Sequence, residues 1–152
     1  MRSASKVELD AVSWKLLDVL QDDARASFSD LSRELNLSAP AVAERMRRLE
    51  ATGVIERYTV QINRAVLGYP ITAVVRASVG RARYDAFTEV VRDMPGVVEC
   101  HHTTGPQDFI LKIVGQSVEA MDDIIDRLSA YGTTETSVVL SSPVASKNVV
   151  KP

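Results

Sequence analysis

The chain has 152 residues, 45% of them hydrophobic, which suits one or two domains with packed cores and excludes a wholly disordered protein. No apolar run approaches the roughly 20 residues that span a bilayer, and the single cysteine, Cys100, cannot form an internal disulfide. With a polar N-terminus, these features predict a cytoplasmic protein.

The formal net charge is −2, so overall electrostatics does not indicate a nucleic-acid partner. Residues 1–64 hold ten Lys or Arg against ten Asp or Glu, and residues 65–152 hold eight against ten. Attraction to DNA must therefore come from the local cluster Arg45, Arg47 and Arg48, and from doubling of that cluster by dimerisation.

Three helices are predicted before residue 53. The first follows Asp10, a plausible N-cap, and its apolar periodicity ends near Gln21. The second follows Ser27, which forms a capping box with Asp30 and precedes a short apolar stripe. Each helix therefore has one face that can enter a shared core.

The third helix is predicted from Ser38, a good N-cap, with Pro40 inside its first turn, where proline costs little. One of its faces is apolar, and Gly53 supplies the stop. Asn36 tolerates the left-handed conformation that the preceding turn needs. The second and third helices thus form a predicted helix-turn-helix, with residues 38–50 as candidate reader of a DNA major groove.

The segment after this motif alternates apolar and polar residues over 54–62, which predicts a half-buried strand as in a winged helix-turn-helix. Gly68 and Pro70 then break the pattern. We therefore divide the chain into a DNA-binding domain at 1–62, a linker at 63–70 and a second domain at 71–152.

The second domain is predicted to have the element order βαββαβ. Its strands are expected at 71–79, 97–104, 108–114 and 134–140, and its helices lie after the first and third of these. This order predicts a ferredoxin-like α+β fold, a four-stranded sheet with both helices on one face. Because neither face of the first strand is strongly polar, a second subunit is the simplest cover for the other face.

Four segments of this sequence carry a family resemblance: Leu9–Leu20, Leu37–Tyr58, Val98–Cys100 and Thr104–Leu111. Together they resemble the Lrp/AsnC family of bacterial and archaeal transcription regulators. The resemblance implies a winged helix-turn-helix followed by a ferredoxin-like (RAM/ACT-like) ligand-sensing domain. It also implies dimers that assemble further into octamers or similar rings, and effectors that are amino acids or related small metabolites.

Three features depart from the family pattern. Ser13 stands where the family often has an acidic residue, and Asn36 stands where it often has glycine. His101 and His102 match no pattern of the family, and we expect them to tune effector choice.

The residues predicted to contact DNA are Ser27, Ser29, Ser38, Ala39, Pro40, Ala41, Glu44, Arg45, Arg47 and Arg48. Small residues at the start of the third helix let its backbone approach phosphates and base edges. We assign base-edge contacts to Arg45 and Arg48, and phosphate contacts to Arg47 and the two serines of the second helix. The alternative is a merely solvated helix face, aided by a Glu44–Arg48 pair.

The loop Thr104–Asp108 is the candidate effector site. Its Gly and Pro equally suit an ordinary turn between antiparallel strands, and the residues alone leave both interpretations open. The resemblance favours a cleft between subunits, where backbone N–H groups bind a carboxylate and Asp108 binds an ammonium group. The candidate effector-binding residues are His102, Thr104, Gly105, Pro106, Gln107, Asp108, Ser137 and Val139.

Other chemistries find no support in the sequence. Only Cys100 and His102 share a strand face, and two ligands do not make a structural zinc site, so we expect no metal and interpret Cys100 as a small buried hydrophobe. No nucleophile elbow, P-loop or zinc-protease motif occurs, so we expect no catalytic residues, no enzyme activity and no cofactor.

The sequence therefore predicts a homo-oligomeric regulator that binds double-stranded DNA and senses an amino acid, with no membrane partner and a place on the nucleoid. A nucleoid-like architectural DNA-binding protein without an effector is the main alternative. A metabolite-binding module or small enzyme with an incidental N-terminal domain is the third.

Overall fold

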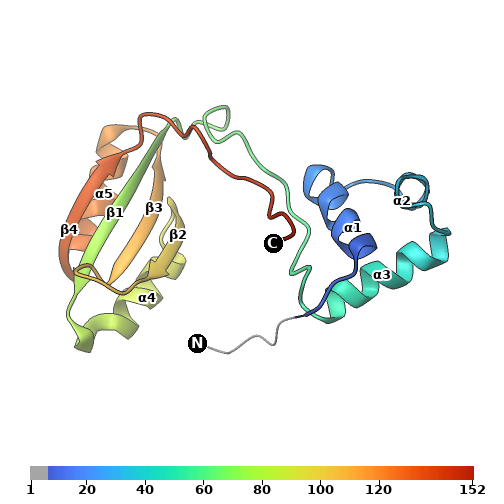
Figure 1. Ribbon diagram of the computed structural model, residues 1–152. Coiled ribbons are helices and arrows are strands. Elements are labelled where there is room, and N and C mark those ends of the chain that lie inside the picture. Colours follow the sequence, from blue (N-terminus) through green and yellow to red (C-terminus); the bar gives the residue numbers. More distant parts are fainter. Residues whose placement is uncertain (1–6) are drawn as a thin grey trace. The chain divides into compact units, whose positions relative to one another are not determined.

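The computed structural model describes residues 7–152, which form two compact units (Figure 1). The first unit, unit 1, runs to Gln61 and also includes Val144–Pro152. The second, unit 2, comprises Ile62–Pro143. Each unit has its own cluster of buried hydrophobic side chains, so each is stabilised by a core of its own.

Unit 1 contains the three predicted helices. They are α1 (Ala11–Asp22), α2 (Phe28–Leu35) and α3 (Ala39–Ala51). Their apolar stripes meet in one core, as the periodicity predicts. The buried members of this core are Leu16, Leu20, Leu31, Leu35, Val42 and Leu49.

The helix starts agree with the predicted caps. The side chains of Asp10, Ser27 and Ser38 accept hydrogen bonds from the backbone N–H groups three residues later, at 2.8, 3.1 and 3.4 Å. Asn36 ends α2 in the left-handed conformation, with φ of 53°. The helix-turn-helix geometry is therefore set by local backbone chemistry on both sides of the turn.

The strand predicted over 54–62 is wrong. The N–H groups of Val54 and Ile55 donate to the carbonyl of Leu49 at 2.9 and 3.0 Å, which closes α3, and residues 56–62 have no regular secondary structure. Within residues 7–152, no segment pairs with this stretch. Its alternating pattern is compatible with a strand, but a strand also needs a hydrogen-bonded neighbour.

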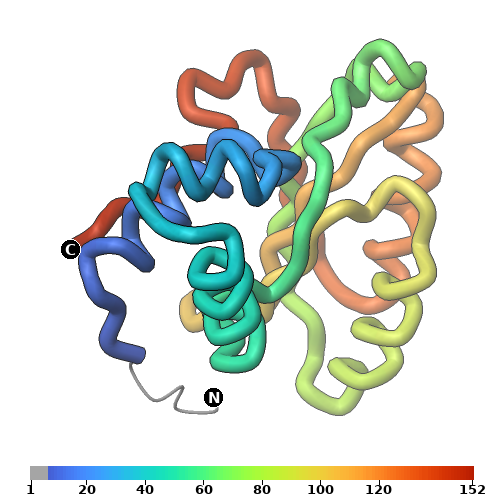
Figure 2. The backbone as a smooth tube through the Cα atoms, turned by 90° about the vertical axis from the view of Figure 1, so that its right-hand side faces the viewer, coloured from blue at the N-terminus to red at the C-terminus, as the bar shows by residue number. Residues whose placement is uncertain are grey.

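The last nine residues return to unit 1, whereas the sequence placed them with the second domain. The Gln21 side chain brackets the backbone of Val149, donating to its carbonyl at 3.0 Å and accepting from its N–H at 2.8 Å. Asn148 donates to the Asp22 carboxylate at 2.6 Å. Figure 2 shows this end of the chain, in red, beside the blue of α1. No local pattern in the tail predicts this return, because it depends on side chains of α1.

Unit 2 has the predicted βαββαβ order. Its strands are β1 (Ile71–Val79), β2 (Val97–His102), β3 (Phe109–Gly115) and β4 (Gly132–Val138). The sheet is antiparallel with the order β2-β3-β1-β4. This arrangement confirms the ferredoxin-like α+β fold.

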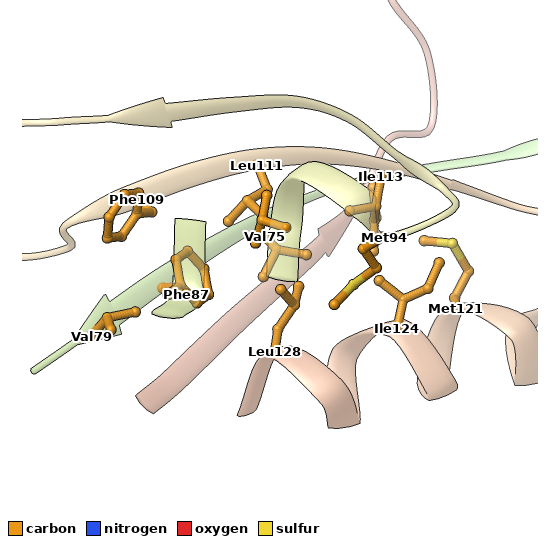
Figure 3. Close-up of a cluster of buried hydrophobic side chains, with 13 residues drawn as sticks. Val75, Val79, Phe87, Met94, Phe109, Leu111, Ile113, Met121, Ile124 and Leu128 are labelled. Atoms are coloured by element: carbon orange, nitrogen blue, oxygen red, sulfur yellow. The ribbon is translucent and has the colours of Figure 1, made fainter. Parts of the chain in front are cut away.

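Two helices, α4 (Tyr84–Asp93) and α5 (Val118–Ser129), cover one face of the sheet, and a single turn of 3₁₀ helix, η1 (Arg81–Arg83), leads into α4 (Figure 1). Figure 3 shows side chains of β3 above those of both helices, in one continuous cluster. Phe87, Leu111, Ile113 and Leu128 are at most 2% exposed. This core fixes the sheet on which the candidate effector loop is mounted.

The other face of the sheet is less covered. Along β1, buried residues alternate with half-buried ones, and the half-buried set includes Thr72, Val74, Arg76 and Ser78. Cover of this face by a second subunit stays a prediction. No helix among residues 7–152 is both long and apolar enough to cross a membrane.

Candidate nucleic-acid interface and effector site

The polar face of α3 carries two exposed arginines. Arg47 pairs with Glu44 at 2.6 Å, both side chains being about 70% exposed. The alternative pairing of Glu44 with Arg48 does not form. Within the described chain, the exposed Arg48 side chain has no hydrogen bond or ion pair, so its guanidinium keeps all five donors for a ligand.

Arg45 has a different environment. Its Nη1 donates to both carboxylate oxygens of Asp10, at 2.9 and 2.7 Å, and to Oγ of Ser13 at 3.0 Å. Hydrogen bonds from the Ser13 side chain and backbone, followed by the bond from Arg45, lower the pKa of Asp10 to about 2. Of the two arginines that the sequence assigns to base edges, only Arg48 is without a partner within the described chain.

The serines predicted to meet phosphate lie at the start of α2. Ser27 Oγ caps the helix and also donates to the Asp30 carboxylate at 2.6 Å. The hydrogen bond from Ser27 is the main reason that the pKa of Asp30 lies below its usual value. Ser27 and Ser29 are exposed, as are Ser38, Ala39 and Pro40 at the start of α3. These residues and Arg48 therefore belong to the solvent-exposed surface of unit 1.

The candidate effector loop connects β2 and β3. Thr103, which sequence reasoning missed, closes it: its N–H donates to the carbonyl of Asp108 at 2.8 Å, and its hydroxyl donates to the carbonyl of Gln107 at 2.9 Å. Gly105 has φ of 132°, a conformation that favours glycine. Ser78 on β1 donates to the carbonyl of Pro106 at 3.1 Å. The loop is thus tied both to itself and to the end of β1.

Both carboxylate oxygens of Asp108 have partners within the chain. Oδ2 accepts from the N–H of Val79 at 2.8 Å, and Oδ1 accepts from the hydroxyl of Tyr84. The Tyr84 hydroxyl is the main cause that lowers the pKa of Asp108, and the carboxylate in turn raises the pKa of Tyr84. Neither partner follows from sequence spacing, because they lie 29 and 24 residues away.

His102 lies beside this pair as part of an aromatic group. Its ring stacks on Phe109 with centroids 4.9 Å apart, and Tyr84 meets it edge-on at 5.2 Å. His101 is exposed and lies 3.7 Å from Glu99. Cys100 is half-buried against the core, and burial raises the pKa of its thiol, as for a small hydrophobe.

Two predicted effector residues lie elsewhere in the same chain. Ser137 pairs with Val74 of β1, and the N–H of Val139 donates to the carbonyl of Thr72 at 2.8 Å. The loop contacts β1 at Ser78 and Val79, four and five strand positions from Val74, which corresponds to roughly 14–17 Å. One chain therefore does not bring these residues to the loop.

Family models match both units of this chain. The AsnC-type helix-turn-helix domain matches residues 9–50, and the Lrp/AsnC ligand binding domain matches residues 72–149. These matches bear out the resemblance on which the sequence-based prediction rests.

Named relatives extend this likeness over most of the chain. The HTH-type transcriptional regulator LrpC of Bacillus subtilis is 35% identical, over 89% of this chain and 94% of the relative. The leucine-responsive regulatory protein of Rhizobium meliloti is 33% identical, over 86% of each. These relatives are transcriptional regulators, not enzymes, which confirms the prediction that the chain does no catalysis.

Solved structures agree with the sequence comparisons. The structure of B. subtilis LrpC superposes with a TM-score of 0.87 at 34% identity, covering 92% of this chain and all of that one. Transcriptional regulator NMB0573 of Neisseria meningitidis, in complex with L-Met, has a TM-score of 0.87 at 25% identity, covering 93% and 96%. The chain belongs to the Lrp/AsnC family and is a transcriptional regulator with a DNA-binding helix-turn-helix domain and a ligand-binding domain.

Proposed function

We propose that this regulator binds an operator as a homodimer or higher oligomer such as an octamer, with α3 in the major groove, and that an amino acid adjusts its occupancy of the DNA. The observation that carries the proposal is Arg48, an exposed guanidinium on α3 without a partner in the described chain. Because unit 1 is not basic overall, two symmetric copies of α3 supply the affinity that one copy lacks. This role implies a cytoplasmic, nucleoid-associated protein.

Arg48 is the side chain that we propose for base-edge readout, since a guanidinium can grip guanine through two hydrogen bonds. Arg47 and Glu44 form the neighbouring exposed pair, and Arg47 exchanges Glu44 for phosphate when DNA binds. The small residues 38–41 and the serines of α2 let the backbone approach the phosphates closely.

The effector proposal rests on the loop from Thr103 to Asp108. Backbone N–H groups of this loop bind the effector carboxylate, and Asp108 accepts a hydrogen bond from its ammonium group through a lone pair left by Tyr84 and Val79. Support comes from NMB0573, whose structure contains L-Met. The candidates on β4, Ser137 and Val139, join such a site only if a neighbouring subunit brings them to it.

An architectural protein without an effector is the second candidate. One observation favours it: both carboxylate oxygens of Asp108 already have partners within the chain. A thermal-shift screen with the twenty amino acids separates the candidates, because only a sensor gains stability from one of them.

The decisive experiment is a footprint on the DNA around the gene for this protein, with and without each amino acid. A regulator with an effector protects a defined site, and one amino acid changes the extent of protection. Uniform protection of any DNA that none of the twenty amino acids changes would favour the architectural protein. No protection at all would contradict both.

A further inference from the structure

The three hydrogen bonds of Arg45 join two elements that are far apart in the sequence. Asp10 is the N-cap of α1, and Arg45 lies in the middle of α3, 35 residues later. Ser13, the third member, is 8% exposed, and its own N–H donates to Asp10 at 2.8 Å. We call this group, Asp10, Ser13 and Arg45, the α1–α3 clamp.

The space beside the clamp has both polar and apolar walls. A cavity of about 430 Å³ lies beside it, lined in part by Arg48 and Thr52 of α3 and by all three clamp residues. Leu9 and Leu49 also line this cavity, and Leu49 and Val42 are the buried apolar residues of α3. The hydrogen bonds of the clamp therefore add a directional connection between the start of α1 and α3 to the apolar contacts on this side.

The ion pair between Asp10 and Arg45 persists near neutral pH because both groups are charged. The pKa of Asp10 is about 2, so its carboxylate is ionised, and arginine stays protonated at any ordinary pH. The Arg45 side chain is 31% exposed, compared with 69% for Arg47. Moving Arg45 onto a base would leave Asp10 without its ion-pair partner next to the phosphates of DNA, a like-charge arrangement.

We propose that Arg45 is a positioning residue: through Asp10 and Ser13 it fixes the orientation of α3 on α1, and it does not itself contact DNA. This proposal rests on the proposed DNA binding by α3, and it reassigns the base contact that the sequence predicted for Arg45. Arg48 is then the long side chain of α3 that contacts bases. Because the clamp fixes the orientation of α3, it also fixes where the Arg48 side chain points.

The test compares Arg45→Ala, Asp10→Ser and the double variant in the full-length protein. Serine at position 10 keeps an N-cap for α1 but is too short to pair with Arg45. Arg48→Ala is the control for a true DNA contact. Lys15→Ala, which breaks the exposed Lys15–Glu34 pair at 2.9 Å, is the matched control for an ion pair in unit 1 that does not involve α3.

Fluorescence anisotropy gives Kd for the footprinted duplex and for a scrambled duplex over a series of salt concentrations. If Arg45 positions α3, each single variant raises Kd for the specific duplex roughly two- to fivefold, the range of a partly exposed ion pair, and the double variant is no worse than either. The ratio of specific to scrambled affinity falls, while the salt dependence is unchanged. Arg48→Ala, as the loss of a base-edge contact, lowers the same ratio roughly five- to 150-fold, also without changing the salt slope. Lys15→Ala changes neither.

A DNA-contacting Arg45 gives the opposite pattern and would overturn the proposal. Arg45→Ala would lower the salt slope if Arg45 contacted a phosphate, and for a phosphate or a base contact alike Asp10→Ser, which frees the arginine, would leave Kd unchanged or lower it. A residue that only stabilises unit 1 would lower the melting temperature and leave the specificity ratio intact well below melting, which also overturns positioning.

A double-mutant cycle on the melting temperature tests the clamp without DNA. We expect the loss from the double variant to be smaller than the sum of the single losses. Additive losses would show that Asp10 and Arg45 do not act as a pair. Energetic coupling of Asp10 and Arg45 in a wild-type protein that prefers no duplex would contradict the proposed function, and the positioning role would fail as a consequence. A wild type that prefers the footprinted duplex, with Arg45 variants that keep this preference, would contradict the positioning role alone.

Discussion

The reading helix α3 and the loop from Thr103 to Asp108 differ in how they use their charged side chains. A helix satisfies its interior backbone groups by itself, so Arg47 and Arg48 remain on its surface for a ligand. The loop follows strands that have just ended, and it must find partners for their backbone. Pairing of β1 with β3 stops at Ala77 and Phe109, and the N–H of Val79 beyond it donates to Asp108.

A charged residue in a ligand loop can thus serve structure before it serves a ligand. Arg45 is the exception on α3, since Asp10 and Ser13 bind it as Tyr84 and Val79 bind Asp108. On α3 the residue with internal partners, Arg45, is the candidate for positioning, and its unpaired neighbour Arg48 is the candidate for recognition, whereas in the loop Asp108 is proposed to do both.

The largest expected effect tests whether the two units are stabilised separately. Phe87→Ala should lower the free energy of unfolding of unit 2 by about 3–5 kcal/mol, because Phe87 is fully buried in its core. Trp14, the single tryptophan, lies in α1 and reports unit 1 by fluorescence, while far-UV circular dichroism reports both units. Denaturant titrations should show the circular dichroism transition shifting while the Trp14 transition stays. Phe28→Ala, at a 49% exposed site, is the matched control.

Arg48→Ala tests whether this exposed arginine of α3 contacts DNA. We expect a loss of about 1–3 kcal/mol in binding to the specific site, the usual value of a bidentate contact with guanine. A gel-shift titration at fixed salt measures it. Arg47→Ala should cost less and should weaken specific and scrambled DNA equally, as a phosphate contact does. Unchanged affinity in Arg48→Ala would remove it from the reading surface.

Asp108→Ala and Tyr84→Phe test whether Asp108 binds the effector or only anchors the loop. If Asp108 binds the ammonium group, Asp108→Ala should raise the effector Kd about tenfold or more, because a charge-assisted hydrogen bond is lost. Tyr84→Phe removes only a supporting hydroxyl, and its effect should be several times smaller. Isothermal titration calorimetry with the amino acid found by thermal shift measures both. Equal losses in the two variants would make Asp108 a loop anchor alone.

The smallest effect concerns acid stability of the α1–α3 clamp. The pKa of Asp10 falls from 3.8 to about 2 on folding, so its contribution to stability is complete above 3.8 and is lost as the pH falls through 2. Asp10→Ser should flatten the pH dependence of unit 1 unfolding over that window. Thermal melts followed at Trp14 measure it. An unaltered slope would mean that Asp10 is not the titrating group.

The sequence alone was sufficient for the local elements and for their order. Apolar spacing and caps predicted α1, α2 and α3, and the βαββαβ order predicted the sheet, because helix and strand periods depend on neighbours a few residues apart. The αL turn at Asn36 followed in the same way. Resemblance in the motifs then identified the family, which the comparisons confirm.

Tertiary structure decided which charged residues are available and which segments pair. The partners of Arg45, Asp108 and Gln21 lie 35, 29 and 128 residues away, and no local pattern contains them. Residues 54–62 have the alternation of a strand but no neighbour in the described chain, so they form none. Periodicity shows which face a side chain occupies, whereas only the packed fold shows what it meets there.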